Sequence, residues 1–201
     1  MLTERGRLAW DLLGLGLLAG WFTLVNGWAT TRWLLLAAVL HELCHWLGLL
    51  ALGGEGVRLR LSPFGAVMET AGLRLSYPAE LTAVLAGPMG NFAAAAGMAV
   101  FAPQEEQALA VGANCVLGLF NLLPAAPLDG WRALELAGCW LLGPDRGCLW
   151  AGRIGGLASA VLCGGILWLV AASGGNLWLL PAALCVGRAG IRAGFGEKRG
   201  Q

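Results

Sequence analysis

Apolar runs long enough to cross a bilayer occupy most of this 201-residue chain and leave few ways in which it can fold. A spanning helix needs about 20 predominantly apolar residues. We therefore predict an all-α polytopic membrane protein that forms a single domain over residues 1–201. The sequence has six candidate transmembrane helices, which are roughly Leu8–Val25, Trp33–Leu52, Ala79–Ala102, Ala108–Leu123, Trp150–Ala172 and Leu177–Ile191.

The scarcity of charge supports the same reading. Charged residues make up 12% of the chain and hydrophobic residues 58%, whereas a soluble domain carries roughly 25% charged residues. A soluble enzyme is therefore not expected, and the lipid bilayer is the expected environment. The formal net charge of +1 gives no basic field, so we do not expect nucleic acid as a partner.

The basic residues predict the orientation in the membrane. If the N-terminus is cytosolic and the chain crosses six times, twelve of the thirteen basic residues fall on the cytosolic side, and Arg32 is the exception. This asymmetry is typical of a multi-pass protein of the bacterial cell membrane with both termini in the cytosol.

Two segments that connect the predicted helices differ in pattern from the apolar spans. Between Gly53 and Tyr77, apolar and basic residues alternate on either side of a turn signal at Ser62–Gly65, which predicts a small β-hairpin or re-entrant loop between the second and third helices. The stretch Asp129–Leu142 is predicted to be an amphipathic helix at the interface, with Arg132 and Glu135 on its water-facing side.

The two histidines of the chain lie four residues apart in the second predicted helix, in His41-Glu42-Leu43-Cys44-His45. Positions four apart share one helix face, so His41 and His45 can bind one metal ion. Glu42 lies about 100° around the helix and can act as a general base, as in an H-E-x-x-H zinc site. Three polar side chains at membrane depth are costly unless they form a site.

A third metal ligand is predicted at Asp129. It follows Pro124 and Pro127 at the end of the fourth predicted helix, and Gly130 allows a sharp turn after it. Irregular backbone at membrane depth is tolerated inside protein or beside a water-filled cavity. The alternative is an ordinary helix end with a polar cap. Because catalytic zinc uses three protein ligands, we favour the metal-binding interpretation.

These motifs resemble those of the site-2 protease family of intramembrane zinc metalloproteases. The resemblance rests on three segments and extends over roughly residues 8–191. It is greatest for the sporulation (stage IV) branch, which processes pro-sigma-K. The segments are His41-Glu42-x-x-His45, Ala86-Gly87-Pro88-Met89-Gly90-Asn91 and Asn121-x-x-Pro124-x-x-Pro127-Leu128-Asp129-Gly130.

The resemblance implies one Zn²⁺ per chain and a zinc metalloendopeptidase activity, with His41, His45 and Asp129 as ligands and Glu42 as the catalytic base. It also implies that Asn121 holds the substrate backbone, and the alternative for this residue is a helix–helix hydrogen bond. Asn91 is either a substrate contact or a packing residue. The turn residues are further substrate-binding candidates, and the alternative for them is a plain re-entrant turn; they are Pro63, Phe64 and Gly65.

The implied substrate is a transmembrane or membrane-associated segment of another protein, such as a membrane-tethered sigma factor precursor, and an inhibitory membrane partner is compatible with the resemblance. Two features depart from the family pattern. No counterpart of the branch's nucleotide-sensing CBS domain follows the last predicted helix, and Trp131 stands where relatives often have a second glycine.

Two other functions are weighed against this one. A catalytically inactive relative that acts as a membrane scaffold would not need Glu42 together with all three presumed ligands, which are present. A metal transporter would need further ionisable residues along a path through the membrane, and only Asp11 is available.

Overall fold

The computed structural model describes residues 16, 19–53, 57–62, 65–70, 75–173 and 179–195. Helices dominate this part of the chain, as the sequence predicts. The elements are α2 (Trp28–Ala51), β1 (Val57–Ser62), β2 (Gly65–Thr70), α3 (Tyr77–Phe101), α4 (Gln104–Asn121), α5 (Asp129–Leu142), α6 (Pro144–Ala172) and α7 (Leu180–Phe195).

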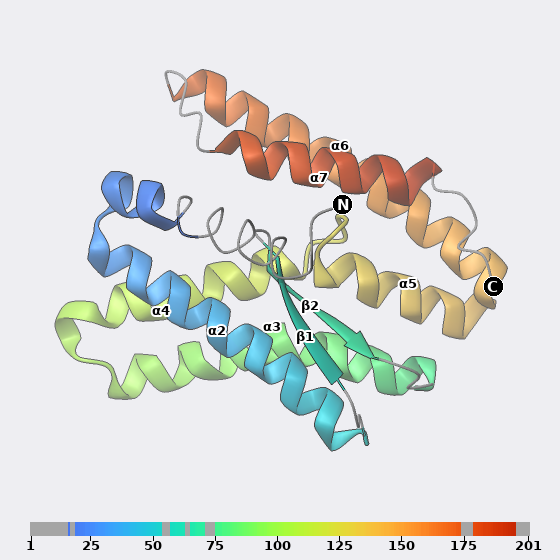
Figure 1. Cartoon of the computed structure of the whole chain (residues 1–201), viewed down its shortest axis with the longest axis horizontal. Helices are drawn as coiled ribbons and strands as arrows, with labels where there is room; N and C mark the ends of the chain where they lie inside the picture. The colour runs from blue at the N-terminus through green and yellow to red at the C-terminus, as the bar shows by residue number, and fades with distance from the viewer. Residues whose placement is uncertain are drawn as a thin grey trace, which may run out of the picture.

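The helices form two groups joined by α5 (Figure 1). In the first group α2 packs against α3 and α4, and α3 packs against α4. In the second group α6 and α7 lie side by side, and α5 packs against both α6 and α3. The start of α5 is therefore held next to the α2–α3–α4 group.

Small residues fill the interfaces, and large apolar residues point outward. Among the buried positions, Ala37, Ala83 and Ala110 are at most 3% exposed, whereas Phe101 is 85% and Leu184 74% exposed. Membrane helices pack in this way, because small side chains let the backbones approach and lipid covers the large ones.

Three of the described helices are long and apolar enough to cross a membrane, namely α2, α3 and α6. They correspond to the second, third and fifth predicted spans. The fourth and sixth predictions are helical but are not confirmed as spans. The first turn of α4 contains Glu105 and Glu106, and α7 has only 16 residues. Most of the first predicted span, with Asp11, lies outside the described residues.

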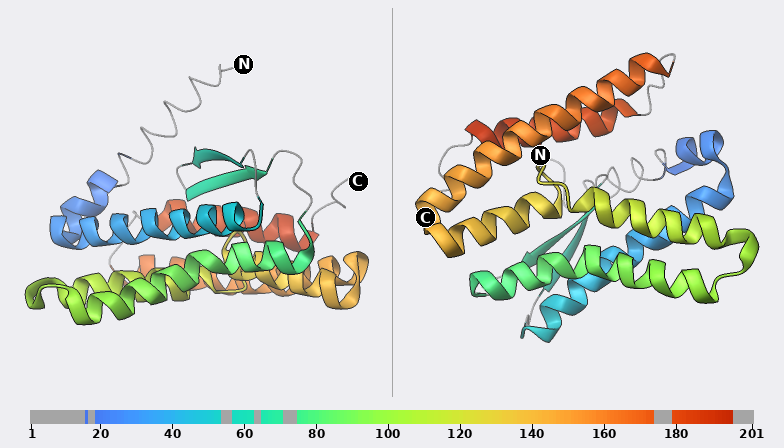
Figure 2. Two further views of the ribbon diagram at one scale, coloured as in Figure 1. Left: turned by 90° about the horizontal axis from the view of Figure 1, so that it is seen from below. Right: turned by 180° about the vertical axis from the view of Figure 1, so that it is seen from behind.

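The segment after α2 contains an antiparallel strand pair. Its register runs from Val57 opposite Thr70 to Ser62 opposite Gly65. Figure 2 (left) shows the pair on the side of α2 away from α3. The turn residues Pro63 and Phe64 fall outside the described residues, so their predicted role stays a prediction.

Helix α5 has the predicted bounds, but its polar side chains do not simply face water. Arg132 forms ion pairs with Glu135 on the same helix and with Glu80 in the first turn of α3. The side chain of Glu135 is only 14% exposed. The Arg132 side chain is 34% exposed while it pairs with both acids, so the placement of this side of α5 toward water stays a prediction.

Candidate metal centre

Helix α2 supplies two of the predicted ligands and the predicted base. His41 and His45 are one turn apart, and their side chains are 6% and 13% exposed. Glu42 follows His41 and is half-buried. The three side chains predicted from the H-E-x-x-H pattern thus lie on one stretch of α2.

Asp129 is the first residue of α5, and Leu128 is the N-cap. A carboxylate in the first turn is favoured there by the free N–H groups of the helix end. The close approach of the backbone at the next position requires glycine, because a Cβ on Gly130 would overlap the carbonyl oxygen of Leu122 and lie 2.5 Å from that of Leu123. Gly130, the second residue of α5, thus lets the first turn of this helix lie directly against the backbone at the end of α4.

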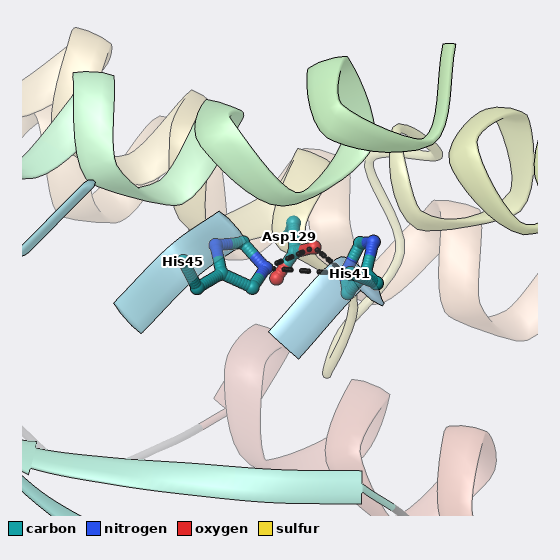
Figure 3. Close-up of side chains that lie close together, drawn as sticks. All are labelled: His41, His45 and Asp129. Carbon is teal, nitrogen blue, oxygen red and sulfur yellow. Dashed lines mark hydrogen bonds and ion pairs between the residues drawn. The ribbon is translucent and has the colours of Figure 1, made fainter. Parts of the chain in front are cut away.

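The structure brings the three predicted ligands together (Figure 3). Asp129 Oδ2 lies 2.9 Å from His41 Nε2 and 3.1 Å from His45 Nε2, and the two Nε2 atoms are 3.1 Å apart. Atoms bound to a tetrahedral zinc at about 2.0–2.1 Å lie roughly 3.3 Å from one another. The three atoms therefore form a triangle of nearly the size that one zinc ion needs.

The other ring nitrogen of each histidine has an oxygen partner. His45 Nδ1 lies 2.9 Å from the carbonyl oxygen of Ala83, and His41 Nδ1 lies 2.6 Å from Asn91 Oδ1. A carbonyl oxygen only accepts hydrogen bonds, so each Nδ1 carries the proton. In the neutral rings, the lone pairs are then on the Nε2 atoms that face Asp129.

This proton arrangement fits a metal site. Two nitrogen lone pairs and a carboxylate oxygen converge within 3.1 Å of one another, and they require positive charge between them. Metal-binding histidines commonly donate their second N–H to a carbonyl or carboxylate. Among the described residues, these three form the cluster that could hold a metal ion, and two imidazoles with one carboxylate suit zinc.

Close packing against α3 holds the His45 ring in place. A Cβ on Gly87 would overlap the imidazole, lying 2.5 Å from its Cε1 atom, and a Cβ on Gly90 would overlap Cys44. Sequence reasoning assigned Gly87 to a motif but gave it no role. The structure shows that it leaves the space that the His45 ring occupies.

The structure describes two of the predicted substrate-binding residues outside the ligand cluster, Asn121 and Gly65. Asn121 is the last residue of α4, is half-buried, and donates its amide N–H to the Leu117 carbonyl of the same helix. Gly65 begins β2. The loop between α4 and α5 exposes Pro124 and Pro127. The backbone of this loop contacts α6, where the Ser159 hydroxyl lies 3.2 Å from the Ala126 carbonyl oxygen.

Asn114 is a polar residue of this region that sequence reasoning missed. It lies in α4, is 2% exposed, and contacts Asn91. An unpaired amide within an apolar span is costly, and this is the signal that could have identified it.

No family model and no curated protein matches this sequence. Among solved structures, the site-2 protease from Methanocaldococcus jannaschii has a similar structure, with a TM-score of 0.65 and 22% sequence identity. The alignment covers 95% of this chain and 90% of that chain. The present chain therefore shares the fold of a site-2 protease over nearly its whole length.

Proposed function

We propose that this protein is a zinc-dependent intramembrane endopeptidase of the site-2 protease type. The observation that carries the proposal is the convergence of His41 Nε2, His45 Nε2 and Asp129 Oδ2 within 3.1 Å, with both Nδ1 atoms already bonded to oxygen. Glu42 beside these ligands and the shared fold support a hydrolytic role rather than a purely structural metal.

The proposed setting is the bacterial cell membrane. The outward-facing large apolar residues of α2, α3 and α6 support contact with lipid. We propose six crossings with cytosolic termini, on the basis of the distribution of basic residues. Arg32, the basic residue outside this pattern, forms an ion pair with Glu106 at the start of α4, which offsets its charge.

In the proposed reaction, His41, His45 and Asp129 would hold a zinc ion, which would supply Lewis-acid polarisation of the scissile carbonyl and lower the pKa of bound water toward about 7. Glu42 accepts a proton from the attacking water and later donates it to the leaving amine. The Asp129 side chain is 25% exposed, compared with 6% for His41, so a substrate would approach from the side of Asp129.

We propose that the substrate is a transmembrane or membrane-associated segment, such as that of a tethered sigma factor precursor. Such a segment must unwind before cleavage, because its helical hydrogen bonds shield the peptide groups. An outer edge of the two-stranded β1–β2 sheet could bind the unwound chain by strand addition. Asn121, Pro63, Phe64 and Gly65 are proposed substrate contacts, and an inhibitory membrane protein is a proposed partner.

The test is to purify the full chain in detergent, measure its zinc content, and assay cleavage of a co-expressed membrane substrate. Glu42→Gln should retain zinc and lose cleavage, because the amide cannot accept the proton. Cleavage at the normal rate by this variant would overturn the assignment of Glu42 as the base. A zinc-loaded wild-type protein that cleaves none of the membrane proteins it is expressed with would instead favour the scaffold function.

A further inference from the structure

A chain of buried amides crosses three helices and ends at His41. Asn91 of α3 is fully buried at 0% exposure, and Asn114 of α4 is 2% exposed. Asn91 Oδ1 lies 2.6 Å from His41 Nδ1, and Asn91 Nδ2 donates to Asn114 Oδ1 at 3.0 Å. Burying amides at this depth is costly unless they are hydrogen-bonded, so the arrangement needs an explanation.

Backbone carbonyls fix the direction of every hydrogen bond in this chain. Asn114 Nδ2 donates to the Ala110 carbonyl at 2.9 Å, which leaves Asn114 Oδ1 facing Asn91. Asn91 Nδ2 donates to this oxygen and also to the Ala37 carbonyl, at 3.0 Å each. Both amide protons of Asn91 are then used, and only Oδ1 is left to face His41.

An amide oxygen cannot donate a hydrogen bond. His41 must therefore carry its proton on Nδ1, where Asn91 Oδ1 accepts it, and the lone pair of the neutral ring is on Nε2. Rotating the Asn91 amide by half a turn would place its oxygen against the Ala37 carbonyl and Asn114 Oδ1. Three acceptor oxygens would then meet, so the network opposes this rotation.

We propose that Asn91 and Asn114 are positioning residues that hold His41 in the tautomer and orientation required for metal binding. This inference rests on the proposed metal site and deepens it. It also decides between the two roles predicted for Asn91. A side chain with no exposed surface, and with its donors and its oxygen already bonded within the protein, is not a substrate contact.

The two histidines are held in different ways. Ala83 orients His45 through its backbone carbonyl, which a side-chain substitution leaves in place. His41 is instead oriented by a side chain, and that side chain is locked by a second one from a third helix. The orientation of His41 is thus sensitive to Asn114, which reaches His41 through Asn91.

The experiment measures the zinc affinity of the full chain in detergent by competition with a chromophoric chelator. Loss of a partner that orients a metal ligand typically costs 10–100-fold in affinity. Asn91→Leu should fall in this range, and Asn114→Leu should lower the affinity by up to about 10-fold. In the Asn91→Leu background, Asn114→Leu should have no further effect, because its action passes through Asn91.

Two variants provide the comparison. Thr31→Val removes a polar group of the same 2% exposure from α2, and it should leave the zinc affinity unchanged because Thr31 bonds only the Gly27 carbonyl of its own helix among the described contacts. Asn114→Thr should restore most of the affinity. A threonine hydroxyl can donate to the carbonyl four residues earlier, as Thr31 does, and still accept from Asn91.

Unchanged zinc affinity in a folded Asn114→Leu variant would overturn the proposal, as would additive effects of the two leucine substitutions. Asn114→Ala serves the same comparison where the leucine variant does not fold. These failures differ from failure of the proposed function, because a wild-type chain that binds no zinc would contradict the metal site itself.

Discussion

Asp129 Oδ2 lies 2.9 Å from His41 Nε2, although 88 positions separate the two residues in the chain. Helix α2 carries the histidine, and the first turn of α5 carries the carboxylate. The contact depends on the close packing of Gly130 against the backbone at the end of α4 and on the docking of α5 against α3. The proposed metal site is therefore a property of the tertiary fold, and substitutions outside the ligand set should change it.

Gly87→Ala should weaken zinc binding without touching a ligand. The new methyl group would overlap the His45 ring, which must rotate or shift away from the other two ligands. We expect a loss of zinc affinity of at least about 10-fold, in the range found when a metal-binding histidine loses its orientation. The measurement is chelator competition on the purified protein.

Gly97→Ala is the matched control for this substitution, since Gly97 lies in the same helix and has open space where the methyl group would go. Alanine is favoured over glycine in a helix by up to about 1 kcal/mol, so this variant should keep its affinity and its stability. Equal zinc affinity of the Gly87→Ala and wild-type proteins would contradict the described packing of His45.

Gly155→Ala should destabilise the contact between α5 and α6. A Cβ at this position would overlap the indole ring of Trp131, and overpacking of this kind typically costs about 1–3 kcal/mol. Trp131→Ala should be less harmful in the Gly155→Ala background than in the wild type, because the smaller side chain relieves the overlap. Thermal unfolding of the four proteins in detergent measures this coupling.

Gly164→Ala, in the same helix but with open space around the new methyl group, should leave the melting temperature unchanged or slightly higher. If Gly155→Ala behaves in the same way, Trp131 does not pack against α6 as described. Gly155 leaves the space that the Trp131 indole occupies.

A mild thiol oxidant such as diamide should link Cys139 and Cys148. Both are free, and their sulfur atoms lie 3.0 Å apart at the junction of α5 and α6. Burial and the neighbouring Cys148 thiol raise the pKa of Cys139 to about 12, and Cys148 is the exposed member of the pair that the oxidant can reach. Counting free thiols after denaturation should show the loss of two in the wild type.

The Cys148→Ser variant is the control for this oxidation, and it should retain the Cys139 thiol. If the wild-type protein loses no thiols under conditions that oxidise a test dithiol, the described junction of α5 and α6 is incorrect.

The sequence predicted the ligands because their chemistry is local or unusual for its surroundings. His41, Glu42 and His45 share a helix face, and Asp129 is an acid beside two helix-breaking prolines within an apolar chain. The bounds of α5 and the strand character of Val57–Leu61 also followed from residue patterns. These signals depend on neighbours in the sequence, and the structure preserves them.

The remaining features depend on which helices meet. Nothing next to Arg132 in the sequence indicates that Glu80 of α3 will pair with it. Likewise, Asn114 acquires its meaning only when α4 packs beside α3. Within the described residues, length and apolarity confirm three of the predicted spans, because α4 has two acids in its first turn and α7 has 16 residues.

The most direct test of the central claim is the zinc content of the purified chain, measured by elemental analysis for the wild type and for Asp129→Ala. The wild type should contain close to one zinc per chain, and Asp129→Ala should contain far less after the same chelator wash, because it loses one of three ligands. Equal zinc content in the two proteins would contradict the proposed site. Asp129 would then be only an acidic residue that stabilises the N-terminal end of α5.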